Sequence, residues 1–314
     1  YSGIYRAYWR AHRRDDSKIP EGRDVCTSTS EDFLDWSEPE WLDYEPNRSG
    51  SSELDQTDDP TGDHHQLYCN GVLAYHRAPH LLLGFPHRYV DRGWTTSTDV
   101  LPDRQRRREL ADLNVKGGRP TREGTVVTDV LFMASRDGRR FFVWPQAFVR
   151  PGIQRPGSWY YGDTWNAWGL VETASRYEAS PPELSFYINE AEHRDGPGRL
   201  RRYTLRLDGF GSIYASLAGG SAVTRPLTFV GSQLQINFSS SAGGRVRVEI
   251  QGGQGEAIPG FALDDCQLQY GDQLDRIVSW KNGADVGALQ NRPVRLKFEL
   301  KDADVFAFQF LGTG

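Results

Sequence analysis

Hydrophobic residues along this chain recur mainly at every second position or in short runs that end at Gly, Pro, Asp or Ser. A period of two is typical of strands, whereas the spacing of a long amphipathic helix is nearly absent. Residues 104–113 are the one stretch with the pattern of a short helix. Strands are predicted in the first two thirds of the chain at residues 4–9, 67–75, 81–89, 126–134, 141–149, 168–173, 184–189 and 200–207. The sequence therefore predicts an all-β protein.

From about residue 215 the alternation becomes sharper. Residues 234–238, 246–250 and 294–300 alternate strictly between apolar and polar, and Gly-rich segments that we interpret as turns lie between them. Such segments predict strands with one buried face and one wet face, as in a β-sandwich or jelly roll. A length of 314 residues suits two domains. We therefore predict one domain over residues 1–214 and a β-sandwich over residues 215–314.

A short motif occurs twice before residue 215. Residues 27–36 read TSTSEDFLDW and residues 133–144 read MASRDGRRFFVW, while residues 205–210 keep only the turn. Each full copy predicts a strand, a tight turn after Ser-x-Asp, and an aromatic strand. The Ser or Asp side chain is expected to accept hydrogen bonds from the turn's backbone N–H groups, and Gly to supply positive φ. Repeated hairpins of this kind predict the blades of a β-propeller.

The turn SRDG with Phe142 and Trp144 resembles the blades of five-bladed propeller glycosidases of the invertase-like and arabinanase-like families. Other stretches are similar to bacterial proteins labelled glycosyl hydrolase family 32-like, at residues 6–10, 77–80, 84–86 and 201–210 and, in a C-terminal jelly roll, 224–228, 259–261, 296–304 and 308–310. The resemblance implies a glycosidase-like propeller over residues 1–214, a carbohydrate substrate or ligand, and no cofactor. We expect the natural chain to begin upstream of Tyr1, because the opening is already strand-like and Met133 is the only Met.

The chain departs from the invertase pattern at its catalytic motifs. Those enzymes carry a nucleophilic Asp in the first blade, an Asp within Arg-Asp-Pro and an acidic Glu within Glu-Cys. None of these motifs occurs here, and Asp59-Pro60 lacks the preceding Arg. No catalytic residue is therefore transferred from that family.

Candidate catalytic acids come instead from the strand pattern. Glycoside hydrolysis needs two carboxyl groups, about 5–5.5 Å apart for retention and about 6.5–9.5 Å apart for inversion. Asp129, Glu172 and Glu190 each lie within or at the end of an apolar strand segment. An acid there is unfavourable unless it is paired, hydrogen-bonded or functional. The alternatives are an ion pair or strand-end cap for Asp129 and rim salt bridges for the two glutamates.

Further residues suit contacts with a sugar. The candidates are Asp63, His65, Asn70, Arg77, Arg88, Arg122, Trp159 and Trp165. Arginines can pair with a carboxylate or sulfate through two hydrogen bonds, and aromatic rings can stack on a sugar. Turn structure, buried ion pairs and packing between blades are the alternatives. His64 and His65 would point to opposite faces of a strand, so no metal site is predicted.

Composition excludes several other classes. Net charge is −5, which argues against nucleic-acid binding, and the basic run at residues 104–108 is expected to be a solvated loop or exposed helical turn. No apolar run approaches the roughly 18 residues of a membrane span. Three widely spaced Cys make no disulfide scaffold. Two main functions stay open, a glycoside hydrolase with a carboxylate pair in an axial pocket and a non-catalytic carbohydrate-binding protein, with a protein-interaction propeller as the third. Oligomeric state and compartment stay open, an extracytoplasmic location being slightly favoured.

Overall fold

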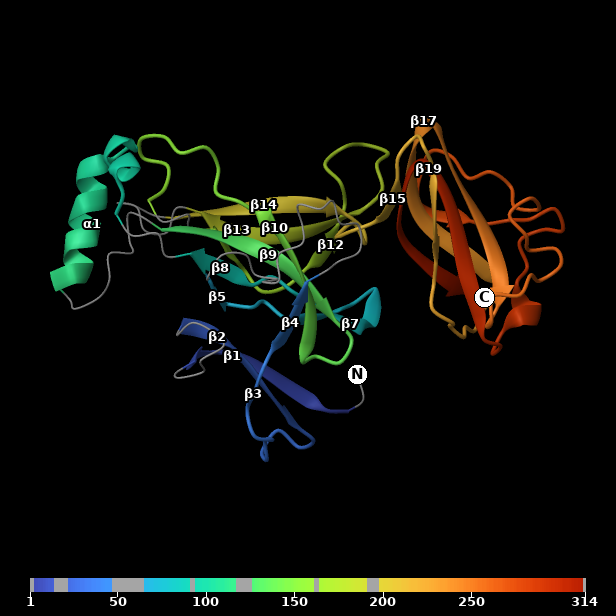
Figure 1. Ribbon diagram of the computed structural model, residues 1–314, viewed down its shortest axis with the longest axis horizontal. Helices are drawn as coiled ribbons and strands as arrows, with labels where there is room; N and C mark the ends of the chain where they lie inside the picture. Colours follow the sequence, from blue (N-terminus) through green and yellow to red (C-terminus); the bar gives the residue numbers. More distant parts are fainter. Residues whose placement is uncertain are drawn as a thin grey trace. The chain divides into compact units, whose positions relative to one another are not determined.

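The computed structural model describes residues 3–13, 22–46, 65–90, 94–116, 126–160, 164–190 and 198–312. Strands form most of its regular structure (Figure 1), which confirms the prediction of a mostly β protein. Up to residue 206 the strands are β1 (Tyr5–Arg13), β2 (Gly22–Ser30), β3 (Glu40–Trp41), β4 (Asp43–Pro46), β5 (His65–Tyr68), β6 (Leu73–Tyr75), β7 (Ala78–Gly84), β8 (His87–Val90), β9 (Val127–Ser135), β10 (Arg140–Val149), β11 (Thr164–Asn166), β12 (Val171–Thr173), β13 (Glu183–Glu190) and β14 (Arg199–Arg206).

These strands form three sheets. The first has the order β1-β2-β3, and the second runs β4-β10-β9-β7-β6, with β8 pairing with β9 and β5 pairing with β8. The third has the order β11-β13-β12, and β14 also pairs with β13. Strand β9 lies inside the second sheet, and its residues Leu131 and Met133 are fully buried. Burial on both faces explains why residues 130–134 form an unbroken apolar run.

The repeated motif forms the same turn at both places, as predicted. Ser135 Oγ accepts the N–H of Gly138 at 2.9 Å, and Asp137 Oδ1 accepts the N–H groups of Arg139 and Arg140, each at 2.8 Å. At the other copy, Ser30 Oγ and Asp32 Oδ1 accept N–H groups of the residues that follow them in the same way. The number of blades to which these hairpins belong stays a prediction.

Two strands predicted as continuous are interrupted. Residues 67–75 form β5 and β6 with a break between them, because Cys69 and Gly71 take positive φ values of 50° and 55°. Residues 81–89 are divided between β7 and β8, and the break falls at Phe85-Pro86. Proline cannot donate a ladder hydrogen bond, so a sheet strand ends there readily.

The predicted short helix exists as α1 (Arg104–Lys116), which follows the short 3-10 helix η2 (Thr96–Val100). The prediction of a solvated basic run is wrong for one of its members. Arg107 is only 1% exposed and donates hydrogen bonds to the carbonyl oxygens of Pro102, Trp159 and Tyr160. Three carbonyl acceptors compensate its guanidinium for the lost water.

The chain divides into two compact units. The first unit comprises Tyr1–Val171 and Ser185–Thr204, and the second comprises Glu172–Leu184 and Leu205–Gly314. Strands of the second unit beyond residue 206 are β15 (Ile213–Ala215), β16 (Gly220–Val223), β17 (Gln233–Gly252), β18 (Asp272–Ile277) and β19 (Val294–Leu311), with the 3-10 helix η3 at Gly287–Leu289. Their sheet order is β15-β19-β17-β18, and β16 also pairs with β19. The predicted boundary at residues 214 and 215 stays a prediction.

In the second unit two long strands replace several predicted short ones. The segments 234–238 and 246–250 are the two halves of β17, so the turn predicted between them is wrong. The register with β19 shifts between Ser240 and Arg245, which marks a bulge. A Cβ at Gly244 would clash with the carbonyl oxygen of Asp302 on β19, a residue whose own φ is +42°. Close approach of the two backbones therefore requires glycine at this point.

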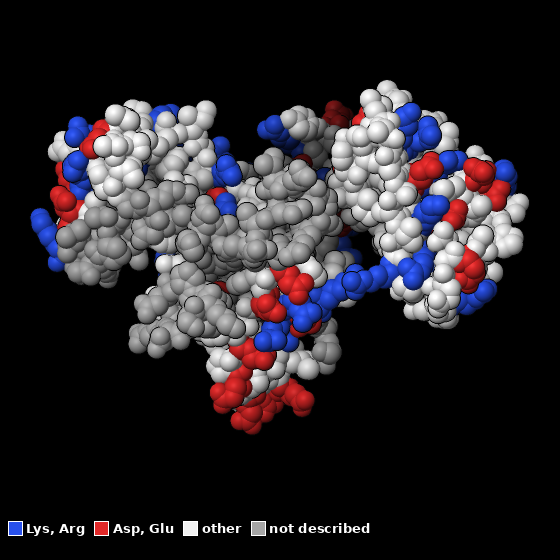
Figure 2. Space-filling model, viewed as in Figure 1, with Lys and Arg blue, Asp and Glu red and all other residues white. Residues whose placement is uncertain are grey.

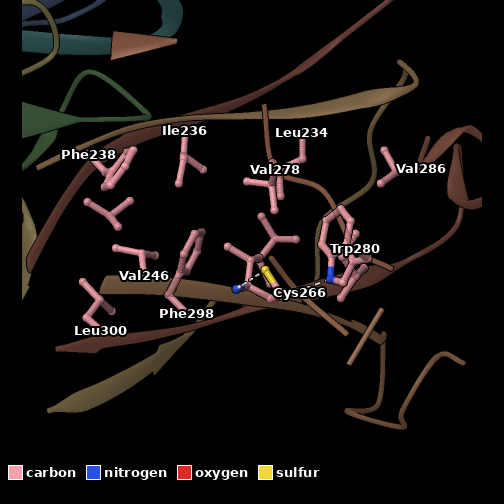
Figure 3. Packing of buried hydrophobic residues seen from close by; sticks show 14 of the residues in the cluster. Leu234, Ile236, Phe238, Val246, Cys266, Val278, Trp280, Val286, Phe298 and Leu300 are labelled. Carbon is pink, nitrogen blue, oxygen red and sulfur yellow. Dashed lines mark hydrogen bonds between the residues drawn. The ribbon is translucent and has the colours of Figure 1, made fainter. Parts of the chain in front are cut away.

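The bulge keeps both halves of β17 facing one core. Leu234, Ile236, Phe238, Val246, Val248 and Ile250 are all fully buried in a single cluster, part of which Figure 3 shows. Within it the N–H of Val248 donates to Cys266 Sγ at 3.2 Å, and Trp280 Nε1 donates to the Val248 carbonyl at 3.0 Å. The strict alternation predicted one buried face, and this face is present. The β-sandwich class of the unit stays a prediction.

The three Cys form no disulfide. Cys26 and Cys266 are buried, as expected of small hydrophobic residues, and Cys69 is partly buried. Within the described ranges no helix is long and apolar enough to cross a membrane. The same ranges hold no cluster of three or more His, Cys, Asp or Glu that could bind a metal ion.

Candidate functional site

A cavity of about 510 Å³ lies in the first unit. One wall is the segment after β10, from Arg150 to Trp159, and the other is built from Thr164, Glu190 and three residues of β14. Thr164 and Glu190 are direct neighbours in the antiparallel pairing of β11 with β13. Pairing between distant strands therefore assembles this cavity from segments about 50 residues apart.

Alternation along β14 decides which side chains reach the cavity. Arg199, Arg201 and Tyr203 all line it, and they stand at every second position. Side chains at every second position share one face of a strand. Arg202 takes the opposite direction, and its Nε donates to Ser185 Oγ at 2.7 Å. The cavity face of β14 therefore presents two guanidinium groups and a phenol in a row.

Glu190 is the only carboxylate among the described residues that line the cavity. Its Oε2 accepts a hydrogen bond from Arg201 Nε at 2.9 Å, and its Oε1 accepts one from Tyr203 Oη at 2.6 Å. Burial raises the pKa of Tyr203 to about 12, and the hydrogen bond and charge of Glu190 act in the same direction. Tyr203 therefore keeps its proton at neutral pH and acts as a donor.

The wall from Arg150 to Trp159 is held in place by hydrogen bonds from both its own residues and α1. Trp159 Nε1 donates to the carbonyl of Gly152 at 2.9 Å, which closes the segment on itself. Buried Arg107 donates to the carbonyls of Trp159 and Tyr160 at 3.0 and 2.9 Å. The helix therefore fixes the end of the segment that carries the indole ring.

Asp129 does not line the cavity. Its two carboxylate oxygens accept hydrogen bonds from Nε and Nη2 of Arg88 at 2.8 and 2.6 Å, and Arg88 Nη1 donates to the Pro145 carbonyl at 3.0 Å. The two residues are direct neighbours in the pairing of β8 with β9. Two residues predicted separately, one catalytic and one sugar-binding, are thus partners in one ion pair. A catalytic role for Asp129 stays a prediction.

Trp165 packs beside a histidine that the strand pattern did not single out. The ring centroid of His87 lies 4.7 Å from that of Trp165, and His87 Nε2 lies 2.7 Å from Asn166 Oδ1. Burial lowers the pKa of His87 to about 4, although Asn166 and Asp129 act to raise it. The imidazole is therefore neutral at pH 7. It serves as a packing and hydrogen-bonding group of the interior.

The remaining candidates are dispersed. Asn70 accepts the N–H of Val72 at its side-chain oxygen, so it stabilises the break between β5 and β6. Arg77 is exposed in the turn before β7, and exposed Glu172 belongs to the second unit. Asp63, Arg122 and the side chain of His65 lie outside the described residues. Of the predicted site residues that are described, the cavity brings together Glu190 and Trp159.

Sequence reasoning missed all four arginines of the cavity. Arg150, Arg155, Arg199 and Arg201 line it, and none was a candidate. The signal present in the sequence was the alternation of residues 199–203, which was interpreted only as a strand. Arginines at every second position of a strand, followed by a tyrosine in the same phase, indicate one polar face.

No family model and no curated protein sequence matches the chain. Among solved structures it has a weak likeness to a glycoside hydrolase family 43 arabinoxylan arabinofuranohydrolase from Bacillus subtilis, solved with cellotetraose, at 10% identity and a TM-score of 0.26. The match covers the whole chain and 53% of that protein, so the chain spans about half its length. A Bombyx mori GH32 β-fructofuranosidase matches at 9% identity and a TM-score of 0.26, over the whole chain and 78% of the enzyme. Likeness at this level leaves the function to be inferred from the cavity itself.

Proposed function

We propose that this protein recognises a carbohydrate and that the cavity of the first unit is its sugar site. The observation that carries the proposal is the combination of Trp159 and Tyr203 with charged hydrogen-bonding groups around about 510 Å³. Pockets for small ligands span roughly 300–1,000 Å³. A sugar presents an apolar ring face and a rim of hydroxyls, and aromatic rings beside polar side chains complement both.

The polar groups are arranged for hydroxyl ligands. Glu190 offers acceptor oxygens, and the arginines offer donors. The hydroxyl of Thr164 is buried and has no hydrogen-bond partner among the described residues, although it lines the cavity. A buried polar atom without a partner is unfavourable, so a ligand that supplies one gains affinity.

Hydrolysis of the sugar is the second candidate, and the position of Glu190 is the observation that favours it. Glu190 accepts hydrogen bonds at both oxygens, an arrangement that suits a nucleophile or base better than a proton donor. A glycosidase also needs a second carboxyl group within about 10 Å. Neither Asp129 nor Glu172 is among the residues that line the cavity, and Asp129 is already paired with Arg88. The geometry therefore supports binding ahead of cleavage.

Glycan binding by two matched tryptophan variants tests the proposal. Titration calorimetry against a panel of plant and algal polysaccharides should detect at least one ligand, and Trp159→Ala should weaken it roughly tenfold or more, since truncating a tryptophan that anchors a partner costs about 2 kcal/mol or more. Trp36→Ala is the control, because Trp36 is also a partly exposed indole bonded to a carbonyl of its own segment, and it lies outside the cavity. Equal loss in both variants, or no ligand for the folded parent, would contradict the proposal.

Cleavage is tested on the same panel by the release of reducing ends. Release by the parent that Glu190→Gln abolishes, with folding intact, would establish the second candidate. Binding without release would leave the protein a carbohydrate-binding one. Release that survives in Glu190→Gln would place the reaction at other residues.

A further inference from the structure

We infer that the saccharide is anionic and carries carboxylate or sulfate groups, an inference that rests on the proposed sugar site. Four arginines line the cavity against a single carboxylate. A cavity of one dominant charge concentrates ions of the opposite sign, because its low-dielectric walls focus the field. A neutral sugar can accept hydrogen bonds from these arginines, but it gains nothing from their net charge.

Three of the four guanidinium groups are not neutralised. Arg201 pairs with Glu190 at 2.9 Å, whereas Arg150, Arg155 and Arg199 have no carboxylate partner within the described part of the chain. Some arginines elsewhere in the first unit do pair with acids, as Arg88 does with Asp129 and Arg140 with Glu45, whereas Arg136 has no such partner among the described residues. The cavity brings three guanidinium groups without a described carboxylate partner into one place.

Acidic residues of the first unit gather elsewhere. Figure 2 shows red side chains over the connection from β2 to β3, whose exposed acids are Glu31, Asp32, Asp35 and Glu38, followed by Glu40 on β3. Arg139 pairs with Glu40 of this region at 3.6 Å, so the turn carries its own cation. None of these acids lines the cavity, whose own charge is dominated by its four arginines. A cavity of this charge favours an anionic ligand over one that binds by shape alone.

The arginines also come from two separate segments of the chain. Arg199 and Arg201 belong to β14, while Arg150 and Arg155 belong to the segment after β10. The turn at Arg155 is fixed, because Ser158 Oγ donates to the Arg155 carbonyl at 2.7 Å and accepts its N–H at 2.9 Å. Guanidinium groups bind carboxylate and sulfate oxygens through paired hydrogen bonds. Guanidinium groups on two segments can pair with more than one anionic group, which suits a sugar chain with such a group on successive residues.

The test compares pairs of polysaccharides that share a backbone and differ in whether the anionic group is present. One pair is polygalacturonate and its fully methyl-esterified form, and the other is a sulfated galactan and its desulfated form. Titration calorimetry at low salt should give at least about tenfold tighter binding of the anionic member of one pair, since a charge-assisted hydrogen bond contributes about 1.5–3 kcal/mol. Which pair shows the difference identifies carboxylate or sulfate. Raising the salt to about 0.5 M should remove most of the preference.

Matched arginine variants locate the effect. The double variant Arg155→Gln with Arg199→Gln should bind the anionic polymer roughly tenfold or more weakly and leave the neutral member unchanged. Arg136→Gln is the control, because Arg136 is an exposed arginine of the same unit that lies outside the cavity lining. Arg136, Arg155 and Arg199 are all exposed, so the double variant and the control are expected to fold. Circular dichroism checks this.

The outcomes separate this inference from the proposed function. Equal affinity for the charged and neutral members, lost in Trp159→Ala, would overturn the anionic inference and leave the sugar site standing. An equal effect of Arg136→Gln and the double variant would also overturn it. Binding of no polysaccharide would overturn both.

Discussion

Side chains alternate between two faces along the strands of both units, but the two units use this alternation differently. In the second unit, alternation along β17 and β19 buries one core cluster, and polar side chains on the other face are paired, as Arg247 is with Glu299 at 2.7 Å. In the first unit the buried clusters of the described residues are smaller, and alternation along β14 places Arg199, Arg201 and Tyr203 in a cavity. The comparison indicates that polar groups of the second unit are paired within the protein. In the first unit, arginines of the cavity lack a described carboxylate partner, and an anionic ligand could provide one.

The largest expected effect concerns the Arg88–Asp129 ion pair, which is the best buried among the described residues of the first unit. Arg88 and Asp129 have side chains 14% and 12% exposed, so Asp129→Asn leaves a buried guanidinium without its counter-charge. We expect a loss of about 3 kcal/mol in the free energy of unfolding, measured with denaturant. The double change Arg88→Met with Asp129→Leu should recover most of it.

The matched change in the second unit should cost far less. Glu299→Gln leaves Arg247 with Asp264 at 3.2 Å, and Glu299 is already 32% exposed. A loss below about 1 kcal/mol is expected for such a pair. If Glu299→Gln were as destabilising as Asp129→Asn, the contrast between buried and exposed pairing in the two units would be wrong.

A pH dependence follows from His87 in the first unit. Its pKa is about 4 in the folded chain against 6.5 for an unperturbed histidine, so the unfolded chain binds the additional proton between these values. The stabilising contribution of the neutral imidazole is fully present above about pH 6.5 and is lost as the pH falls towards 4, by about 3 kcal/mol at most. His87→Gln should remove this part of the dependence. Parallel stability curves for parent and variant would contradict the assignment.

The bulge of the second unit gives a pair of adjacent glycines for comparison. Gly244→Ala places a Cβ against the carbonyl of Asp302, whereas a Cβ at Gly243 meets nothing within 4 Å. We expect Gly244→Ala to cost about 2 kcal/mol in thermal or denaturant unfolding, and Gly243→Ala to cost much less. Equal effects would show that the close approach of β17 and β19 does not need glycine.

The smallest effect concerns the repeated turn of the first unit. Phe33 takes φ of 68° where the second copy has Gly138 at 80°. A residue with a side chain is strained there by roughly 1 kcal/mol, so Phe33→Gly should stabilise the turn by about that amount, less the lost ring contacts with Tyr5 and Trp36. A clear destabilisation in thermal unfolding would show that those ring contacts outweigh the strain.

Features formed by residues close together in the sequence could be predicted from it. Features that depend on contacts between distant strands could not. The turns at Ser30 and Ser135 were predictable because every donor and acceptor lies within six residues. The bulge in β17 was not, because its cause is the backbone of Asp302 on another strand. The cavity could not be predicted either. Pairing of β11, β13 and β14 brings Thr164, Glu190 and Arg199 into one cavity with the segment after β10. For the same reason Asp129 and Arg88 were assigned separate roles although they form one pair.

The most direct test of the sugar site is a crystal structure of the chain with an oligosaccharide of the tightest-binding polysaccharide. The account predicts a sugar ring against the indole of Trp159, with anionic oxygens within hydrogen-bond distance of Arg155 or Arg199. A saccharide bound elsewhere on the molecule, with this cavity holding only water at saturating ligand, would contradict it.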